Sequence, residues 1–199
     1  AHYVLEERMA QTPEQVISFL NDLLTKAKPA AQKEFEELAA FAKKLDGIDQ
    51  LEKWDGAYYS EKLKQQLFNL DDEILKPYFQ LEKVLEGAFT IAERLYGITF
   101  TEIFDIDKYH EEVRTFEVKD KNNELVAVFY ADFFPRKGKR NGAWMTSFKS
   151  QYVLDNKNER PHISNVCNFT RPTATKPSLL TFNEVTTLFH EFGHGLHGI

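Results

Sequence analysis

Hydrophobic residues recur at helical spacing through the first part of the chain. The segment Thr12-Pro13-Glu14-Gln15 has the form of a capping box with proline at the first helical position, which predicts a helix start. Apolar residues then follow every three or four positions until Lys28-Pro29, where we expect this helix to stop. The same spacing resumes from Ala31 to Leu45 and ends at Asp46-Gly47. The pattern therefore predicts two helices on either side of the proline.

Two further helices are predicted before the texture of the sequence changes. One runs from Trp54-Asp55 to Asn69, and the next runs from Leu81 to Leu95 with Gly97 as its terminator. The last of these has an apolar face and a charged opposite face, which is typical of a helix packed on a core. None of the predicted helices before residue 110 carries visible chemistry, so we interpret residues 1–110 as a helical scaffold.

Residues 111–199 are predicted to form a small sheet followed by one more helix. Four segments are rich in β-branched and aromatic residues: Val113 to Lys119, Leu125 to Phe133, Ala143 to Phe148 and His162 to Phe169. The second is apolar throughout, which indicates a strand covered on both faces. Thr181 to Glu184 forms a second capping box, and an apolar face follows it. We expect a mainly α protein with a small β-sheet (α+β).

Two polar stretches between these strands are expected to be loops. Residues 155–160 are polar, and residues 136–140 hold four basic residues in five. The basic stretch is open to two interpretations, an anion site or a solvated turn, and we favour the solvated turn.

Composition excludes several classes of protein. The 199 residues are 42% hydrophobic and 28% charged, which is typical of a globular domain. A net charge of −6 argues against the positive field of a nucleic-acid-binding protein, so no nucleic-acid partner is expected. The longest apolar run, Leu125 to Ala131, is far shorter than the ~20 residues that cross a bilayer, so no membrane partner is expected. The single cysteine, Cys167, allows no internal disulfide and no cysteine-built metal site.

The predicted last helix carries the chemistry. His190-Glu191-Phe192-Gly193-His194 has the form H-E-x-x-H. Residues four apart on a helix lie one turn along and on nearly the same side, so both imidazoles can bind one zinc ion. Glu191 lies beside that position, where it can accept a proton from metal-bound water and pass it to a leaving amine. The motif predicts peptide hydrolysis, with His190 and His194 as metal ligands and Glu191 as the general base.

The rest of the site is less complete. The glycine at position 193 costs helix stability, and we expect another group to approach closely there. His197 lies on the same face, but its spacing does not fit a third ligand of the metzincin type. We favour a role either in supporting the metal ligands or in packing. A carboxylate should complete the site, yet none follows Glu191, and the upstream Glu184 and Asp132 are poor candidates.

With these residues in view, the chain resembles the thimet oligopeptidase family of zinc peptidases, and most closely its bacterial peptidyl-dipeptidase branch. The resemblance covers essentially all 199 residues. Its most specific part is the run from Thr187 to His194 with Leu196-His197. The other matching segments are Tyr3 to Met9, Thr12 to Glu14, Trp54-Asp55, Tyr58-Tyr59, Tyr78-Phe79, Leu95 to Ile98, Tyr109 to Arg114, Tyr130 to Asp132, Arg136, Lys139, Gly142 to Met145 and Asn165 to Phe169.

The resemblance implies a two-lobed, α-rich enzyme with a deep cleft and a small sheet beside the zinc helix. It implies cleavage of short peptides, with release of dipeptides from the carboxyl end. In this family the third zinc ligand is a glutamate further downstream, and the oxyanion-stabilising residues also lie downstream. We therefore expect this chain to be a piece of one larger catalytic domain. By itself it should be inactive and prone to self-association. Because a sheet edge lines the family's cleft, we expect Gly142 to Met145 to pair with substrate; the alternative is an interior strand whose Trp144 fills the core.

Two other functions stay open. One is an oligoendopeptidase of the same family, and the other is a helical interaction domain in which H-E-x-x-H is incidental. The segment before residue 10 has no secretion signal pattern, and we expect the parent protein in the cytoplasm, with the periplasm as the alternative.

Overall fold

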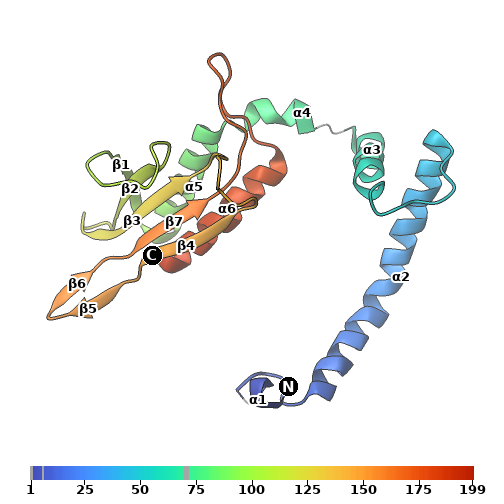
Figure 1. Ribbon diagram of the computed structural model, residues 1–199, viewed down its shortest axis with the longest axis horizontal. Helices are drawn as coiled ribbons and strands as arrows, with labels where there is room; N and C mark the ends of the chain where they lie inside the picture. The colour runs from blue at the N-terminus through green and yellow to red at the C-terminus, as the bar shows by residue number, and fades with distance from the viewer. Residues whose placement is uncertain (1, 6, 70–71) are drawn as a thin grey trace. The chain divides into compact units, whose positions relative to one another are not determined.

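The computed structural model describes residues 2–5, 7–69 and 72–199 (Figure 1). Residues 1, 6, 70 and 71 lie outside the described residues. Of these, Glu6 belongs to the segment Tyr3 to Met9 that carries part of the family resemblance. The chain divides into two compact units, Ala1–Leu70 and Asp71–Ile199, and each is described by itself. The division expected at residue 110 followed the change from helical to β-rich sequence, whereas the second unit also includes the helix and strand just before that position.

The first unit contains α1 (His2–Leu5), α2 (Pro13–Asp46) and α3 (Gly56–Phe68). The capping box at Thr12 is present, because its side chain accepts from the Gln15 N–H. The expected stop at Lys28-Pro29 is wrong, since α2 continues through Pro29. Proline lacks the N–H that would bond the Thr25 carbonyl, and its ring crowds that carbonyl. The helix is exposed to solvent there, so the carbonyl can tilt outward and bond water.

A small core joins α2 to α3 within the first unit. Phe41, Ala42 and Tyr59 are its buried members, and the Tyr59 hydroxyl donates to Asp46 at 3.0 Å. Much of the remaining surface of α2 is apolar and exposed, including Phe19. The first unit therefore buries little of its own hydrophobic surface.

The second unit is a mixed sheet with two long helices. Its elements are α4 (Asp72–Leu75), a 3₁₀ turn (Lys76–Tyr78), α5 (Leu81–Tyr96), β1 (Thr99–Ile103), β2 (Arg114–Lys119), β3 (Leu125–Asp132), β4 (Trp144–Lys149), β5 (Tyr152–Leu154), β6 (Lys157–Glu159), β7 (His162–Val166) and α6 (Phe182–Gly198). The strand order is β1-β2-β3-β7-β4, in which only β3 and β7 are parallel, and β5 pairs with β6 in a separate hairpin. The α+β class expected from the sequence is confirmed.

The four strands expected from β-rich sequence are present, and three strands are additional. β1 was not expected because its sequence is short and mixed. β6 lies within residues 155–160, which were expected to be a loop, and β5 ends just before them. Asp155 and Asn156 adopt positive φ at the tip of that hairpin, so a polar sequence forms a turn between two short strands. Residues 155–160 are thus partly strand, because pairing across the turn supplies their backbone hydrogen bonds.

The core lies between one face of the sheet and the helices α5 and α6 (Figure 1). Phenylalanine rings fill it: Phe89 of α5 stacks on Phe100 of β1 with centroids 4.2 Å apart, and Phe192 of α6 packs against both Phe89 and Phe129. The central strand β3 is buried on both faces, as its continuous apolar sequence predicts. Its Phe129 faces the helices, whereas Tyr130 belongs to a separate cluster on the other face.

Candidate metal centre

The start of α6 is set by a capping box and by a main-chain contact with the segment before α5. The Thr181 side chain accepts from the Glu184 N–H, and the Glu184 carboxylate accepts from the Thr181 N–H, which completes the predicted capping box. Just before it, the Leu180 N–H donates to the Phe79 carbonyl at 2.8 Å. The start of α6 is thereby fixed to the segment that leads into α5.

The two histidines of the motif lie side by side on α6. The Nε2 atoms of His190 and His194 are 3.1 Å apart, and both residues are exposed. Two nitrogens that each bind one zinc ion at ~2.0–2.1 Å can be at most about 4.2 Å apart, so this separation fits two ligands of a single ion. The helical spacing thus produces the donor pair that the sequence predicts.

Glu191 is buried, in contrast to the two exposed histidines. It is 8% exposed, although it carries an ionisable side chain. Burial raises the pKa of the nearby Cys167 thiol to about 12, and the Glu191 carboxylate contributes to that rise. Cys167 therefore stays a neutral thiol at pH 7, unsuited to metal binding, which needs the thiolate.

The described residues contain no cluster of three His, Cys, Asp or Glu side chains that could hold a metal ion. The Glu184 carboxylate caps the start of α6, and the Asp132 carboxylate binds Arg136 and Lys139. Both upstream carboxylates considered from the sequence are thus engaged elsewhere. His197 is exposed near the end of α6.

The helix packs on β7 through a contact that the sequence did not predict. Asn165 of β7 donates from Nδ2 to the main-chain carbonyl of Glu191 at 2.5 Å. A Cβ at Gly195 would lie 2.8 Å from Asn165 Oδ1. The close approach expected at Gly193 is wrong for the described residues, because a Cβ there meets nothing within 4 Å. A single sequence does not show which helical glycine faces a strand.

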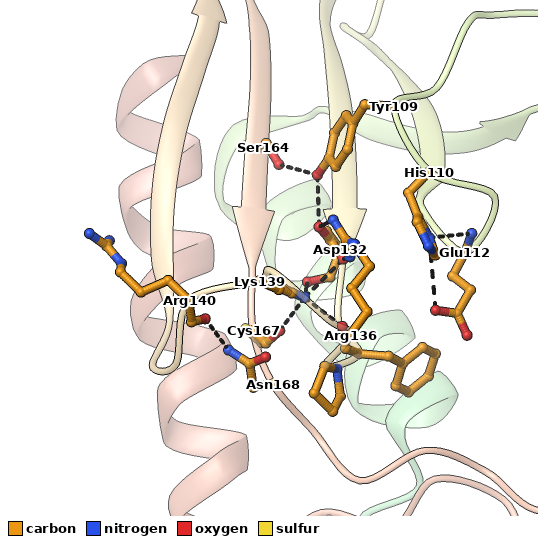
Figure 2. A network of polar contacts seen from close by, with 12 residues as sticks. Tyr109, His110, Glu112, Asp132, Arg136, Lys139, Arg140, Ser164, Cys167 and Asn168 are labelled. Carbon is orange, nitrogen blue, oxygen red and sulfur yellow. Dashed lines mark hydrogen bonds and ion pairs between the residues drawn. The ribbon is translucent and has the colours of Figure 1, made fainter.

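A polar network occupies the sheet face opposite α6, and Figure 2 shows its members in front of the sheet. The Asp132 carboxylate accepts two hydrogen bonds from Arg136, one from Lys139 and one from the Tyr109 hydroxyl. Lys139 also donates to the carbonyls of Phe134 and Cys167. The favoured interpretation of residues 136–140 as a solvated turn is wrong for two of its cations, since Arg136 and Lys139 neutralise a buried carboxylate.

A cavity of about 930 Å³ opens on that same face of the sheet. Tyr109, Trp144 and Phe148 are among its walls, and the Arg140 guanidinium lies 4.6 Å from the Trp144 ring centre. Because His190 and His194 are on α6 across the sheet, this cavity is separate from the candidate metal centre.

The strand β4 is an edge of the sheet. It pairs with β7 on one side, and among the described residues no strand pairs with its other side. Trp144 faces the cavity rather than the core between sheet and helices, so the alternative of an interior strand is wrong. Met145 faces α6, where a Cβ at Gly198 would lie 3.5 Å from its Cε.

A helix with His-Glu-x-x-His, packed on a small sheet beside a free edge strand, is typical of metal-dependent peptidases. Comparison with known sequences agrees: the profile described as "Peptidase family M3" matches residues 1–199, and the chain belongs to that family. No described helix is both long and apolar enough to span a membrane.

Several curated proteins are similar to the chain over nearly all of its length. Oligopeptidase A of Salmonella typhimurium is 49% identical over 198 residues, which cover 99% of this chain and 29% of that protein. Dipeptidyl carboxypeptidase of Escherichia coli is 43% identical over 200 residues, which cover 100% of this chain and 29% of that protein. A thimet-like oligopeptidase of Dictyostelium discoideum is 33% identical over 211 residues, covering 100% of this chain and 31% of that protein. The family resemblance is thus confirmed, and the chain spans less than a third of these relatives.

Proposed function

We propose that the chain is part of a zinc-dependent oligopeptide hydrolase and supplies two of its zinc ligands and its general base. The observation that carries the proposal is the pair of exposed imidazoles with Nε2 atoms 3.1 Å apart on a helix of a family M3 chain. His190 and His194 would hold the ion. A third ligand would come from residues beyond this chain, because a catalytic zinc usually has three protein ligands and a water.

Glu191 is the proton carrier in this proposal. Bound zinc lowers the pKa of its water towards ~7 and polarises a carbonyl. Glu191 follows His190 directly on the helix, so its carboxylate can accept the proton of the attacking water and deliver it to the leaving amine.

The edge strand β4 supports binding of an extended peptide. Its outer N–H and C=O groups have no strand partner among the described residues, and its neighbour β7 contacts α6 through Asn165. An added strand would pair with such an edge and run beside the helix that carries the histidines. Short peptides are therefore the proposed substrates.

Two products are possible for this site. Release of dipeptides from the carboxyl end stays a prediction from the sequence. The higher identity to an oligopeptidase A, 49% against 43% for a dipeptidyl carboxypeptidase, supports the oligopeptidase alternative. A peptide with a blocked carboxyl end separates the two, because only dipeptide release should require the free carboxylate.

Metal content and cleavage by the full-length protein test the proposal. We expect about one zinc per chain, loss of that zinc and of cleavage in His190→Ala, and recovery of wild-type activity when zinc is returned after chelation. Asn183→Ala, on an exposed position of the same helix, is the matched control and should keep both. Full cleavage by zinc-free protein would contradict the zinc-dependent mechanism. Absence of both zinc and cleavage in the wild-type full-length protein would support the interaction-domain alternative instead.

A further inference from the structure

Asn165 links the sheet to the helix that carries the candidate centre. It lies within β7, is 3% exposed, and donates from Nδ2 to the Glu191 carbonyl. In an α-helix that carbonyl also accepts the N–H four residues later, which belongs to Gly195. A carbonyl oxygen has two lone pairs, so both bonds can form at once. A directional bond from the sheet thus holds the helical turn between His190 and His194.

Gly195 leaves the space that this bond requires. A Cβ at residue 195 would lie 2.8 Å from Asn165 Oδ1, whereas the nearest other atom, in the Phe129 ring, would be at an ordinary 3.5 Å. The Asn165 amide is therefore the group that excludes a side chain here. A Cβ at Gly198 would also lie too close to β7, at 2.9 Å from Cδ1 of the buried Ile163, but that contact is apolar.

The buried amide of Asn165 carries a cost in folding free energy. Asn165 Oδ1 is buried and has no hydrogen-bond partner among the described residues. A buried polar atom without a partner destabilises the folded state, and an aliphatic side chain would avoid that cost. The other contacts of α6 with the core are apolar, such as Leu188 and Phe192, and hydrophobic contacts are not directional. They bury one side of the helix, whereas the Asn165 bond ties a defined main-chain atom in the turn between His190 and His194 to β7.

We propose that Asn165 and Gly195 form a positioning lock that sets the axial position of α6 on β7. Asn165 is a positioning residue, because it acts through the main chain of Glu191. The lock places residues 190–194 relative to the edge strand β4, where the peptide would bind. The inference rests on the proposed function only for its effect on zinc and catalysis.

The first test compares single variants of the zinc-loaded full-length protein. Partners that orient metal ligands typically contribute 10–100-fold to metal affinity or activity. We therefore expect Asn165→Ala and Gly195→Ala each to weaken zinc binding or lower kcat by roughly 10–100-fold, with a smaller change in KM. The visible spectrum of the cobalt(II)-substituted protein should shift in both. Asn183→Ala, at an exposed position of the same helix, is the control and should keep the wild-type spectrum and kcat.

The double variant gives the sharper result. Since Gly195→Ala harms the protein by displacing the Asn165 amide, Asn165→Ala/Gly195→Ala should be no worse than either single variant. Additive losses would overturn the lock. So would an Asn165→Ala protein with a lower Tm but an unchanged zinc affinity, kcat and cobalt spectrum, since that result indicates packing alone.

Hydrogen exchange in zinc-free protein separates the lock from the proposed function. We expect Asn165→Ala to speed amide exchange across residues 190–198 more than across residues 182–188, and the exposed control Asn183→Ala to leave exchange across residues 190–198 unchanged. If the wild type binds no zinc, the proposed function fails while this measurement still decides the lock. Uniform or unchanged exchange along α6 would overturn it.

Discussion

The buried carboxylate of Asp132 accepts hydrogen bonds from two loops, through Tyr109 in one and Arg136 and Lys139 in the other. Burial by itself raises the pKa of Asp132, but the hydrogen bonds from Arg136 and Lys139 outweigh it and lower the pKa below its usual value. A carboxyl whose folded pKa is lowered stabilises the protein above its unfolded pKa of ~3.9 and loses that contribution as the pH falls further. The network therefore stabilises the sheet at neutral pH and weakens in acid.

Asp132→Asn should lower the free energy of unfolding by about 3 kcal/mol at pH 7, because it leaves buried cations without their counter-charge. The loss should shrink as the pH falls below about 4, because the carboxyl is then protonated in the unfolded chain and, at still lower pH, in the folded protein as well. Urea unfolding at a series of pH values measures both effects. Asp49→Asn, which removes an exposed pair with Lys43, is the control and should change little. An equal loss at every pH would contradict the assignment.

Glu191→Gln tests the proposed base directly. The amide keeps the size of the side chain but cannot accept the proton, so kcat should fall by at least about 10²-fold. Zinc content should stay near that of the wild type, because His190 and His194 are unchanged. Steady-state kinetics and metal analysis of the full-length protein measure the two outcomes. Near-normal turnover would remove Glu191 from the mechanism.

At the scale of elements, α2 continues past Lys28-Pro29, where the local sequence predicted that the helix would end. Pro29 interrupts the backbone hydrogen bonds but not the apolar spacing on either side, and the helix continues. Interior proline is ~3 kcal/mol less favourable than alanine in a helix. The persistence of α2 through Pro29 thus depends on the helical residues around it.

Pro29→Ala should stabilise the middle of α2 by about 3 kcal/mol locally, since it restores the N–H that bonds the Thr25 carbonyl. Amide exchange of residues 25–33 should slow, and the helical circular dichroism should persist to higher temperature. Lys28→Ala, the neighbouring exposed position, serves as the control because it restores no hydrogen bond. Unchanged exchange in Pro29→Ala would mean that the helix is already bent or open at this point.

At the scale of the molecule, the chain presents much apolar surface, and the part of it that the structure describes holds no cluster of three metal-binding side chains. Ile17, Phe19 and Phe35 are each more than half exposed on α2, at 57%, 62% and 52%. Large exposed apolar patches mark surfaces that are covered by a partner or by other parts of a protein. The span of under a third of the relatives' length agrees with a need for further residues.

Residues 1–199 alone should therefore hydrolyse no peptide, bind zinc weakly through two imidazoles, and self-associate. Light scattering after size-exclusion chromatography measures the association, and a peptide assay with and without chelator measures the activity. Phe19→Ser with Phe35→Ser should reduce the association if α2 drives it. Zinc-dependent cleavage by these residues, or a zinc ion with three ligands from this one chain, would contradict the prediction.

Local sequence determined much of the fold and the core of the site. The capping boxes at Thr12 and Thr181, the Gly97 terminator and the apolar strand β3 all form as predicted, because caps and short-range periodicity act within a few residues. The His190 and His194 pair also follows from one helical turn. In each case the interacting groups are neighbours along the chain.

Only the tertiary structure decided the features that join distant segments. The sequence does not show that β3 pairs with β7, that Lys139 binds Asp132, or that Asn165 faces Gly195. It also left the edge position of β4 open between two alternatives. These contacts depend on which strands become neighbours, and that choice is made by burial of the phenylalanine core over the whole second unit. Helical spacing can place two imidazoles side by side, but only packing against the sheet determines where that pair stands.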